Sequence, residues 1–176
     1  MFGLAIQSRR GNMKTRELTK LALMVAVTVS LSILFIIPVP QTKGFVTLCE
    51  VGIYSSALLF GPTGGLFVGA LSGGLIDLIS GYPEWAIFSV LIHGLQGFLL
   101  GYIYQKFPNK KGMIFGFIIA TLVMVSGYAL ATTLLYTWPA GIASLPGNLV
   151  QNLFGIVVTV PLYQALQRIL RHPQYK

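Results

Sequence analysis

Three side-chain amides follow one another in an otherwise apolar part of this sequence. Asn148, Gln151 and Asn152 are spaced i, i+3 and i+4, so on a helix they share one face. Polar groups are costly in an apolar environment and usually face a bundle interior or a cavity. Three amides within one turn exceed what helix packing needs, which indicates hydrogen bonding to a small polar solute.

A second polar stripe begins at an aromatic residue. Trp85, Ser89 and Gln96 point within about 40° of each other on a helix, and His93 lies near the same sector. At the rise of an α-helix these four positions span roughly 17 Å along the helix axis. In a membrane-spanning helix that distance would lead from the outer edge of the bilayer toward its middle. We expect this face to form one wall of a pocket.

Further candidates lie in other segments. Tyr128 and Thr132 follow helical spacing, and Asp77 and Glu50 are acids expected near the outer face. Each has a structural alternative: a Thr can bond its own backbone, a lone His can bridge two helices, and Asp77 can be merely hydrated. The predicted substrate-binding set is Glu50, Asp77, Trp85, His93, Gln96, Tyr128, Thr132, Asn148, Gln151 and Asn152.

The composition requires a membrane. Of 176 residues 55% are hydrophobic and only 9% are charged, with a mean hydropathy of +0.77, whereas soluble domains average about 25% charged residues. The single-residue alternation of an outer-membrane barrel is missing from the sequence. We therefore predict an all-α integral membrane protein. The one cysteine excludes an internal disulfide and a cysteine-based metal cage.

Six apolar segments are expected, at about 17–37, 46–60, 62–80, 85–104, 113–136 and 148–170, with a linker at 137–147. They form a single domain, 13–176, after a flexible leader, 1–12. Segment 62–80 and the residue before it carry glycines at four-residue spacing, which predicts close helix packing. Their positions are Gly61, Gly65, Gly69 and Gly73.

The distribution of basic residues predicts the orientation. Eleven of the twelve Lys and Arg fall near the N-terminus, in the loop 106–111 or near the C-terminus, and Lys43 is the exception. Basic loops stay cytoplasmic by the positive-inside rule. Six crossings with both termini cytoplasmic place all three clusters on one side. The net charge of +8 therefore reflects topology and indicates no nucleic-acid partner.

The sequence carries no machinery for chemistry of its own. The stretch GPTGGLFVG lacks the lysine and hydroxyl of a phosphate-binding loop, and His93 has no second histidine within the predicted segments. These features argue against catalysis, a cofactor or a bound metal. A pocket without an energy source implies a protein partner.

Two stretches carry a family resemblance: Ala22-x-x-x-Ala26 in the first segment, and DLISGYPEWAIFSVLIHGLQGFLLGYIY from Asp77 to Tyr104. With six segments and basic ends, the chain resembles the substrate-binding S component of an energy-coupling factor (ECF) vitamin transporter. It is most similar to S components assigned to hydroxymethylpyrimidine and pyridoxine. The resemblance covers about 13–171.

The resemblance implies partners and a mechanism. Two cytoplasmic ATPases would drive a transmembrane T subunit, on which Ala22 and Ala26 would dock, because small residues at this spacing let helices approach closely. Packing within the bundle is the alternative role for these alanines. Three stretches would cover the site, and the subunit would topple within a bacterial plasma membrane to release its vitamin. These stretches are 41–47, 81–84 and 137–147.

The substrate remains open between related vitamins. Amides, tyrosines, a tryptophan and acids suit a neutral or weakly cationic heteroaromatic ring. An obligate anion such as pantothenate would more naturally meet an arginine, although Lys43 could bind a carboxylate. We expect capture of pyridoxine or hydroxymethylpyrimidine for ATP-driven uptake. The alternatives are another vitamin such as pantothenate, a stand-alone small-solute carrier, or a membrane scaffold or enzyme.

Overall fold

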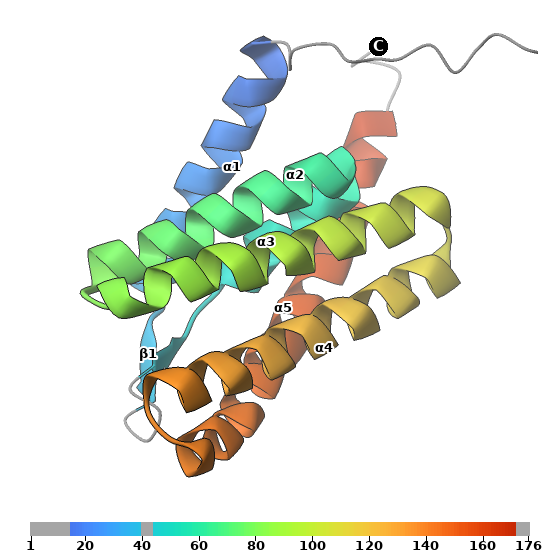
Figure 1. The fold of residues 1–176 in the computed structure, drawn as a ribbon. Helices are drawn as coiled ribbons and strands as arrows, with labels where there is room; N and C mark the ends of the chain where they lie inside the picture. Colours follow the sequence, from blue (N-terminus) through green and yellow to red (C-terminus); the bar gives the residue numbers. More distant parts are fainter. Residues whose placement is uncertain (1–14, 40–43, 172–176) are drawn as a thin grey trace, which may run out of the picture.

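A computed structural model describes residues 15–39 and 44–171, and helices make up nearly all of this part (Figure 1). All five helices in it are long enough and apolar enough to cross a membrane. The expected leader, 1–12, and Lys43 lie outside the described residues. The elements in chain order are α1 (Thr15–Leu34), β1 (Ile37–Val39), β2 (Gly44–Val46), α2 (Cys49–Ser80), α3 (Pro83–Lys106), α4 (Lys110–Leu135) and α5 (Trp138–Arg171).

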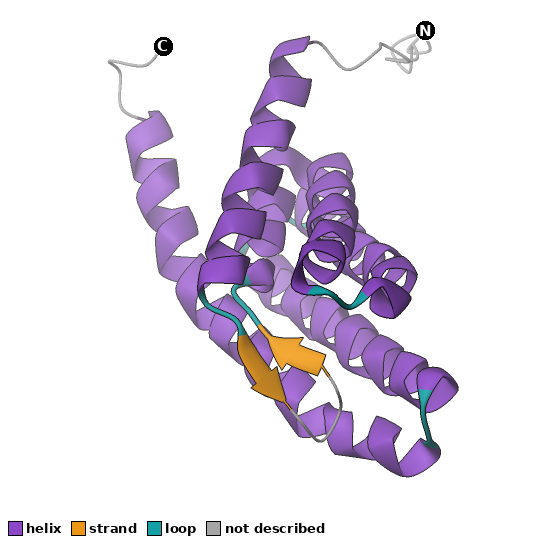
Figure 2. Ribbon diagram, turned by 90° about the vertical axis from the view of Figure 1, so that its left-hand side faces the viewer, coloured by secondary structure: helices purple, strands orange, loops and turns teal. Residues whose placement is uncertain are grey.

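The two strands form a short hairpin. β1 and β2 pair antiparallel, with Ile37 opposite Val46 and Val39 opposite Gly44. The hairpin and the turn between α4 and α5 lie at one end of the bundle, while α1 begins and α5 ends at the other (Figure 2). The stretch 41–47, predicted as a loop, therefore contributes a strand in the part that the structure describes.

Helix α2 changes direction sharply at Gly61, whose φ of 71° and ψ of −161° are not helical. A Cβ placed on Gly65 would lie 2.9 Å from the Cβ of Ala57, although residues eight apart in a straight helix are about 12 Å apart along its axis. The chain thus folds back, with Pro62 at the start of the second arm. The two predicted segments 46–60 and 62–80 correspond to these two arms.

The second arm of α2 packs against α3 through glycine. A Cβ on Gly65 would meet the backbone carbonyl of Gly97, and one on Gly69 would meet the backbone carbonyl of His93. The backbones can approach this closely only because neither helix has a side chain between them. The predicted role of the glycine ridge in packing is confirmed for Gly65 and Gly69, whereas Gly61 forms the fold-back of α2.

The linker predicted at 137–147 is wrong, because α5 already begins at Trp138 and is helical through this stretch. Pro139 lies in the first turn, where a missing N–H costs nothing. Ser144 Oγ donates to the carbonyl of Gly141 at 2.8 Å, so this small polar side chain bonds within the helix. The composition resembles a loop, but the helix tolerates Pro146 at the loss of one backbone hydrogen bond.

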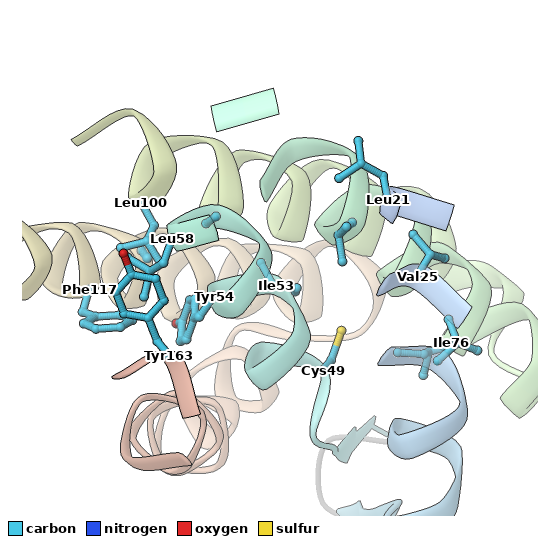
Figure 3. Close-up of a cluster of buried hydrophobic side chains, with 14 residues drawn as sticks. Leu21, Val25, Cys49, Ile53, Tyr54, Leu58, Ile76, Leu100, Phe117 and Tyr163 are labelled. Carbon is cyan, nitrogen blue, oxygen red and sulfur yellow. The ribbon is translucent and has the colours of Figure 1, made fainter. Parts of the chain in front are cut away.

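The core lies between α1, both arms of α2, α3, α4 and α5 (Figure 3). Tyr54 and Phe117 meet edge to face at 5.2 Å between ring centroids, and Leu100 packs beside them, fully buried. Large apolar side chains also cover the outside: Leu134 is 68% and Val157 70% exposed. An apolar exterior around an interior rich in polar groups suits a bundle surrounded by lipid.

We predict that Gly65→Leu destabilises the protein by separating α2 from α3. Overpacking a tight contact typically costs ~1–3 kcal/mol, and here the obstructing atoms belong to backbone. Thermal unfolding in detergent measures the loss. Gly147→Ala is the control, because a Cβ there would meet nothing within 4 Å. Equal unfolding midpoints for Gly65→Leu and Gly147→Ala would contradict the prediction.

Candidate functional site

A single cavity collects most of the polar side chains that the sequence singled out. It lies beside the β2 end of the hairpin and is bordered by both arms of α2 and by α3, α4 and α5. Seven of the ten predicted site residues line it. They are Asp77, Trp85, His93, Tyr128, Thr132, Asn148 and Gln151.

The other three predicted residues lie behind the cavity wall. Glu50, Gln96 and Asn152 have no exposed surface and none of them lines the cavity. They instead hydrogen-bond to the lining residues or to each other. The structure thus places them where they support the site.

Gln96 and Asn152 form the centre of a buried polar cluster. Gln96 Nε2 donates to the Tyr54 hydroxyl at 2.8 Å and to Asn152 Oδ1 at 3.0 Å. Tyr54 also donates to Asn152 Oδ1. Asn152 Nδ2 in turn donates to the carbonyl of Asn148 at 2.9 Å. The cluster therefore links the first arm of α2 to α3 and α5.

His93 connects this cluster to the cavity. Its Nδ1 lies 2.9 Å from Gln96 Oε1, and its Nε2 lies 2.9 Å from the Tyr128 hydroxyl. Tyr128 is also bonded to Ser89 Oγ at 2.6 Å. With both ring nitrogens bonded, the orientation of the imidazole is fixed.

Gln151 joins the hairpin end to the buried acid. Its Nε2 donates to Glu50 Oε2 at 2.7 Å, and its Oε1 accepts from the backbone N–H of Thr47 at 2.9 Å. The other carboxylate oxygen, Oε1, lies 3.7 Å from His93 Nδ1. One amide on α5 thus holds both the carboxylate and the backbone that leads from β2 into α2.

Two polar atoms of lining residues have no hydrogen-bond partner among the described residues. They are Asp77 Oδ2 and Trp85 Nε1, in side chains of residues that are each 5% exposed. Buried polar groups are normally bonded, so orphans require an explanation. The residues that carry this acceptor and this donor both line the cavity, which suits a ligand that carries both functions.

Aromatic rings form another part of the wall. Trp85 lies 6.0 Å from Tyr128 and 6.0 Å from Tyr136 between ring centroids. Faces of this kind bind planar apolar surface while polar groups fix its orientation. Within the described ranges no three His, Cys, Asp or Glu side chains gather as a metal site would require. The arrangement is suited to binding a small planar solute.

Several site residues escaped the sequence analysis. Tyr54 looks like a core residue, although it follows Glu50 by four positions and so shares its face. The stretches 41–47 and 137–147, expected to cover the site, do contribute lining residues: Val46, Thr47, Ala143, Ser144 and Gly147. The lining residues that were not expected are Cys49, Gly73, Ile76 and Met124.

Residues 12–168 match the family described as ECF-type riboflavin transporter, S component. The chain belongs to this family. It is therefore an S component of an ECF-type importer and a multi-pass membrane protein, as the sequence predicted.

Two relatives match most of this S component. It is 37% identical over 158 residues to the thiamine precursor transporter HmpT of Lactococcus lactis subsp. cremoris (strain MG1363), covering 89% of this chain and 91% of that protein. It is 34% identical over 133 residues to an uncharacterized protein in the gap 3' region of Pyrococcus woesei, covering 76% and 88% respectively.

The fold also matches a solved structure described as "Structure and mechanism of the S component of a bacterial ECF transporter". The TM-score is 0.74, and the match covers 89% of this chain and 98% of that one. At 22% sequence identity this likeness concerns the fold. The arrangement of helices in the S component is thus that of a known architecture.

We predict that Gln151→Leu destabilises the S component. The substitution removes the partners of Glu50 Oε2 and Thr47 N–H, and an unsatisfied buried polar group costs ~1–3 kcal/mol. Thermal unfolding in detergent should show a lower midpoint. Val150→Leu is the control, since Val150 is 61% exposed on the same helix. A Gln151→Leu protein as stable as the control would show that these two bonds contribute nothing.

Proposed function

We propose that this S component captures hydroxymethylpyrimidine, a thiamine precursor, at the outer face of the membrane for ATP-driven uptake. The observation that carries the proposal is the pair of orphaned groups, Asp77 Oδ2 and Trp85 Nε1, in two residues that line one cavity. An aminopyrimidine offers an amine that donates and ring nitrogens that accept. Its planar ring suits the wall formed by Trp85 and Tyr128.

The relatives favour the pyrimidine over the other predicted vitamin. HmpT, a thiamine precursor transporter by name, is 37% identical along nearly the whole chain, whereas nothing in the comparisons points to pyridoxine. An anion such as pantothenate lacks a counter-charge, because no Lys or Arg is among the described lining residues. The family description mentions riboflavin, so this larger flavin is the second candidate to test.

We further propose six crossings with both termini cytoplasmic. The fold-back at Gly61 supports separate crossings for the two arms of α2. Basic residues support the orientation: Arg16 and Lys20 lie on α1, Lys106 ends α3, and Arg168 lies near the end of α5. The cavity would then open to the outside, because the hairpin lies at the end opposite to the start of α1.

The transport partners are a T subunit and two cytoplasmic ATPases. Ala22 and Ala26 support a docking role, because both are exposed on α1, while Leu21, Val25 and Val29 make the buried face. Small exposed residues four apart allow another helix to pack closely. The S component would supply binding and the ATPases would supply energy, with release by toppling in the membrane.

Mass spectrometry of the small molecule that co-purifies with the S component, followed by calorimetric titration, tests the substrate. We expect hydroxymethylpyrimidine to bind with a sub-micromolar Kd and pyridoxine and riboflavin to bind more weakly. His93→Leu and Asn152→Leu should each raise the Kd at least about tenfold, equal to about 1.4 kcal/mol, and still assemble with the partners. Riboflavin as the tightest ligand would overturn the pyrimidine assignment.

Bulky residues at Ala22 and Ala26 test the partner proposal. The double variant Ala22→Leu/Ala26→Leu should lose uptake in proteoliposomes that contain all four subunits, yet keep the Kd of the unmodified protein. Leu23→Ile, on the 63% exposed neighbour, is the control. Uptake that persists in the double variant would refute docking through these alanines, and uptake without the T subunit and ATPases would favour a stand-alone carrier.

A further inference from the structure

The donor and the acceptor of each buried hydrogen bond behind the cavity can be assigned, starting from a backbone carbonyl. The carbonyl of Asn148 can only accept, so the Asn152 side-chain atom bonded to it must be Nδ2. Asn152 then presents Oδ1, an acceptor, to Gln96. Gln96 must therefore donate through Nε2, and its two protons go to Asn152 and Tyr54.

This direction determines the protonation of His93. With its amide nitrogen facing Asn152 and Tyr54, Gln96 presents only its Oε1 to the imidazole. An oxygen of an amide cannot donate, so His93 Nδ1 must carry the proton. The tautomer with its proton only on Nε2 would place two acceptors face to face at 2.9 Å.

One buried carboxylate, that of Glu50, lies near the imidazole but does not hydrogen-bond to it. His93 is 4% exposed, and its nearest carboxylate oxygen, Glu50 Oε1, lies at 3.7 Å, beyond ordinary hydrogen-bond distance. A buried cation without such a bond is costly. His93 Nε2 is therefore an acceptor, and the proton in the 2.9 Å bond comes from the Tyr128 hydroxyl.

We infer that Gln96 and Asn152 act as positioning residues that hold His93 as the neutral Nδ1–H tautomer, and thereby make Tyr128 an acceptor toward the cavity. The single proton of Tyr128 is committed to His93, so Ser89 must donate in its 2.6 Å bond to the Tyr128 oxygen. The one lone pair left on that oxygen can only accept.

It follows that the site prefers a substrate with a hydrogen-bond donor at this position. This part of the inference rests on the proposed function. Tyr128 and Asp77 both line the cavity, and both offer acceptors there. The part of a ligand that meets them must donate. An exocyclic amine satisfies this requirement, whereas a carbonyl in its place would meet acceptors and leave them unpaired, as happens when a site built for a donor receives an analogue without one.

Nitrogen NMR of the ligand-free protein tests the tautomer directly. The sequence has two histidines, so ¹⁵N-histidine labelling of His172→Gln leaves only the signals of His93. We expect the pair of ring shifts of a neutral Nδ1–H imidazole. The shifts of an Nε2–H tautomer or of an imidazolium would overturn the inference.

A substitution in the chain tests the positioning role. Gln96→Met keeps the length of the side chain but removes its amide, so we expect a mixture of tautomers and a preference for the amino over the oxo pyrimidine that is reduced about tenfold. Gln167→Met is the matched control, because Gln167 also donates to a tyrosine hydroxyl, that of Tyr163, away from the cavity. An unchanged tautomer or preference in Gln96→Met would refute the role of Gln96.

The binding measurement and the NMR measurement test the proposed function and this inference separately. A protein that binds no pyrimidine but has the Nδ1–H tautomer would overturn the proposed substrate and leave the hydrogen-bond direction standing. A protein that binds hydroxymethylpyrimidine and has an imidazolium at His93 would do the reverse. If Gln96→Met fails to fold, the NMR spectrum of the His172→Gln protein still decides the tautomer.

Discussion

The close approach of α2 and α3 is the contact on which the rest of the structure depends. Glycines at 65 and 97 bring backbone against backbone, and one turn further along the same seam Gly69 meets the backbone of His93. The position of the His93 ring relative to α4 and α5 therefore follows from a contact that contains almost no side-chain atoms. Rigid backbone packing of this kind suits a binding site, because a site must be held to within fractions of an ångström.

Polar groups inside a lipid-embedded bundle must find partners within the protein. Here they do so across helices: Tyr54, Gln96 and Asn152 come from three different helices and bond one another. Two polar atoms beside the cavity, Asp77 Oδ2 and Trp85 Nε1, are left over in the described part of the chain. The mutually bonded Tyr54, Gln96 and Asn152 thus shape the site, whereas Asp77 and Trp85 each keep a polar atom that a solute could bond.

The sequence predicted the helical membrane fold, the family and seven of the side chains that line the cavity, because helical periodicity and intramembrane polarity are local signals. It failed at Trp138–Gly147, where proline and small residues resemble a linker although the stretch is helical. It also missed Tyr54, since the role of its hydroxyl depends on Gln96 and Asn152, which are distant in sequence. Glu50, Gln96 and Asn152 were expected to line the pocket but lie behind it. Depth within a bundle is set by tertiary packing, which no single helix reveals.

The fold-back at Gly61 also accounts for the presence of a cavity in the bundle. The first arm of α2, from Cys49 to Phe60, rises only roughly 18 Å, whereas α3 and α4 have 24 and 26 residues and rise about twice as far. A central helix so much shorter than its neighbours ends well below their ends. The space above it is left to the hairpin and to the cavity, with Cys49 and Thr47 at the boundary. The shortness of the first arm thus leaves room for a binding cavity inside a bundle of otherwise full-length helices.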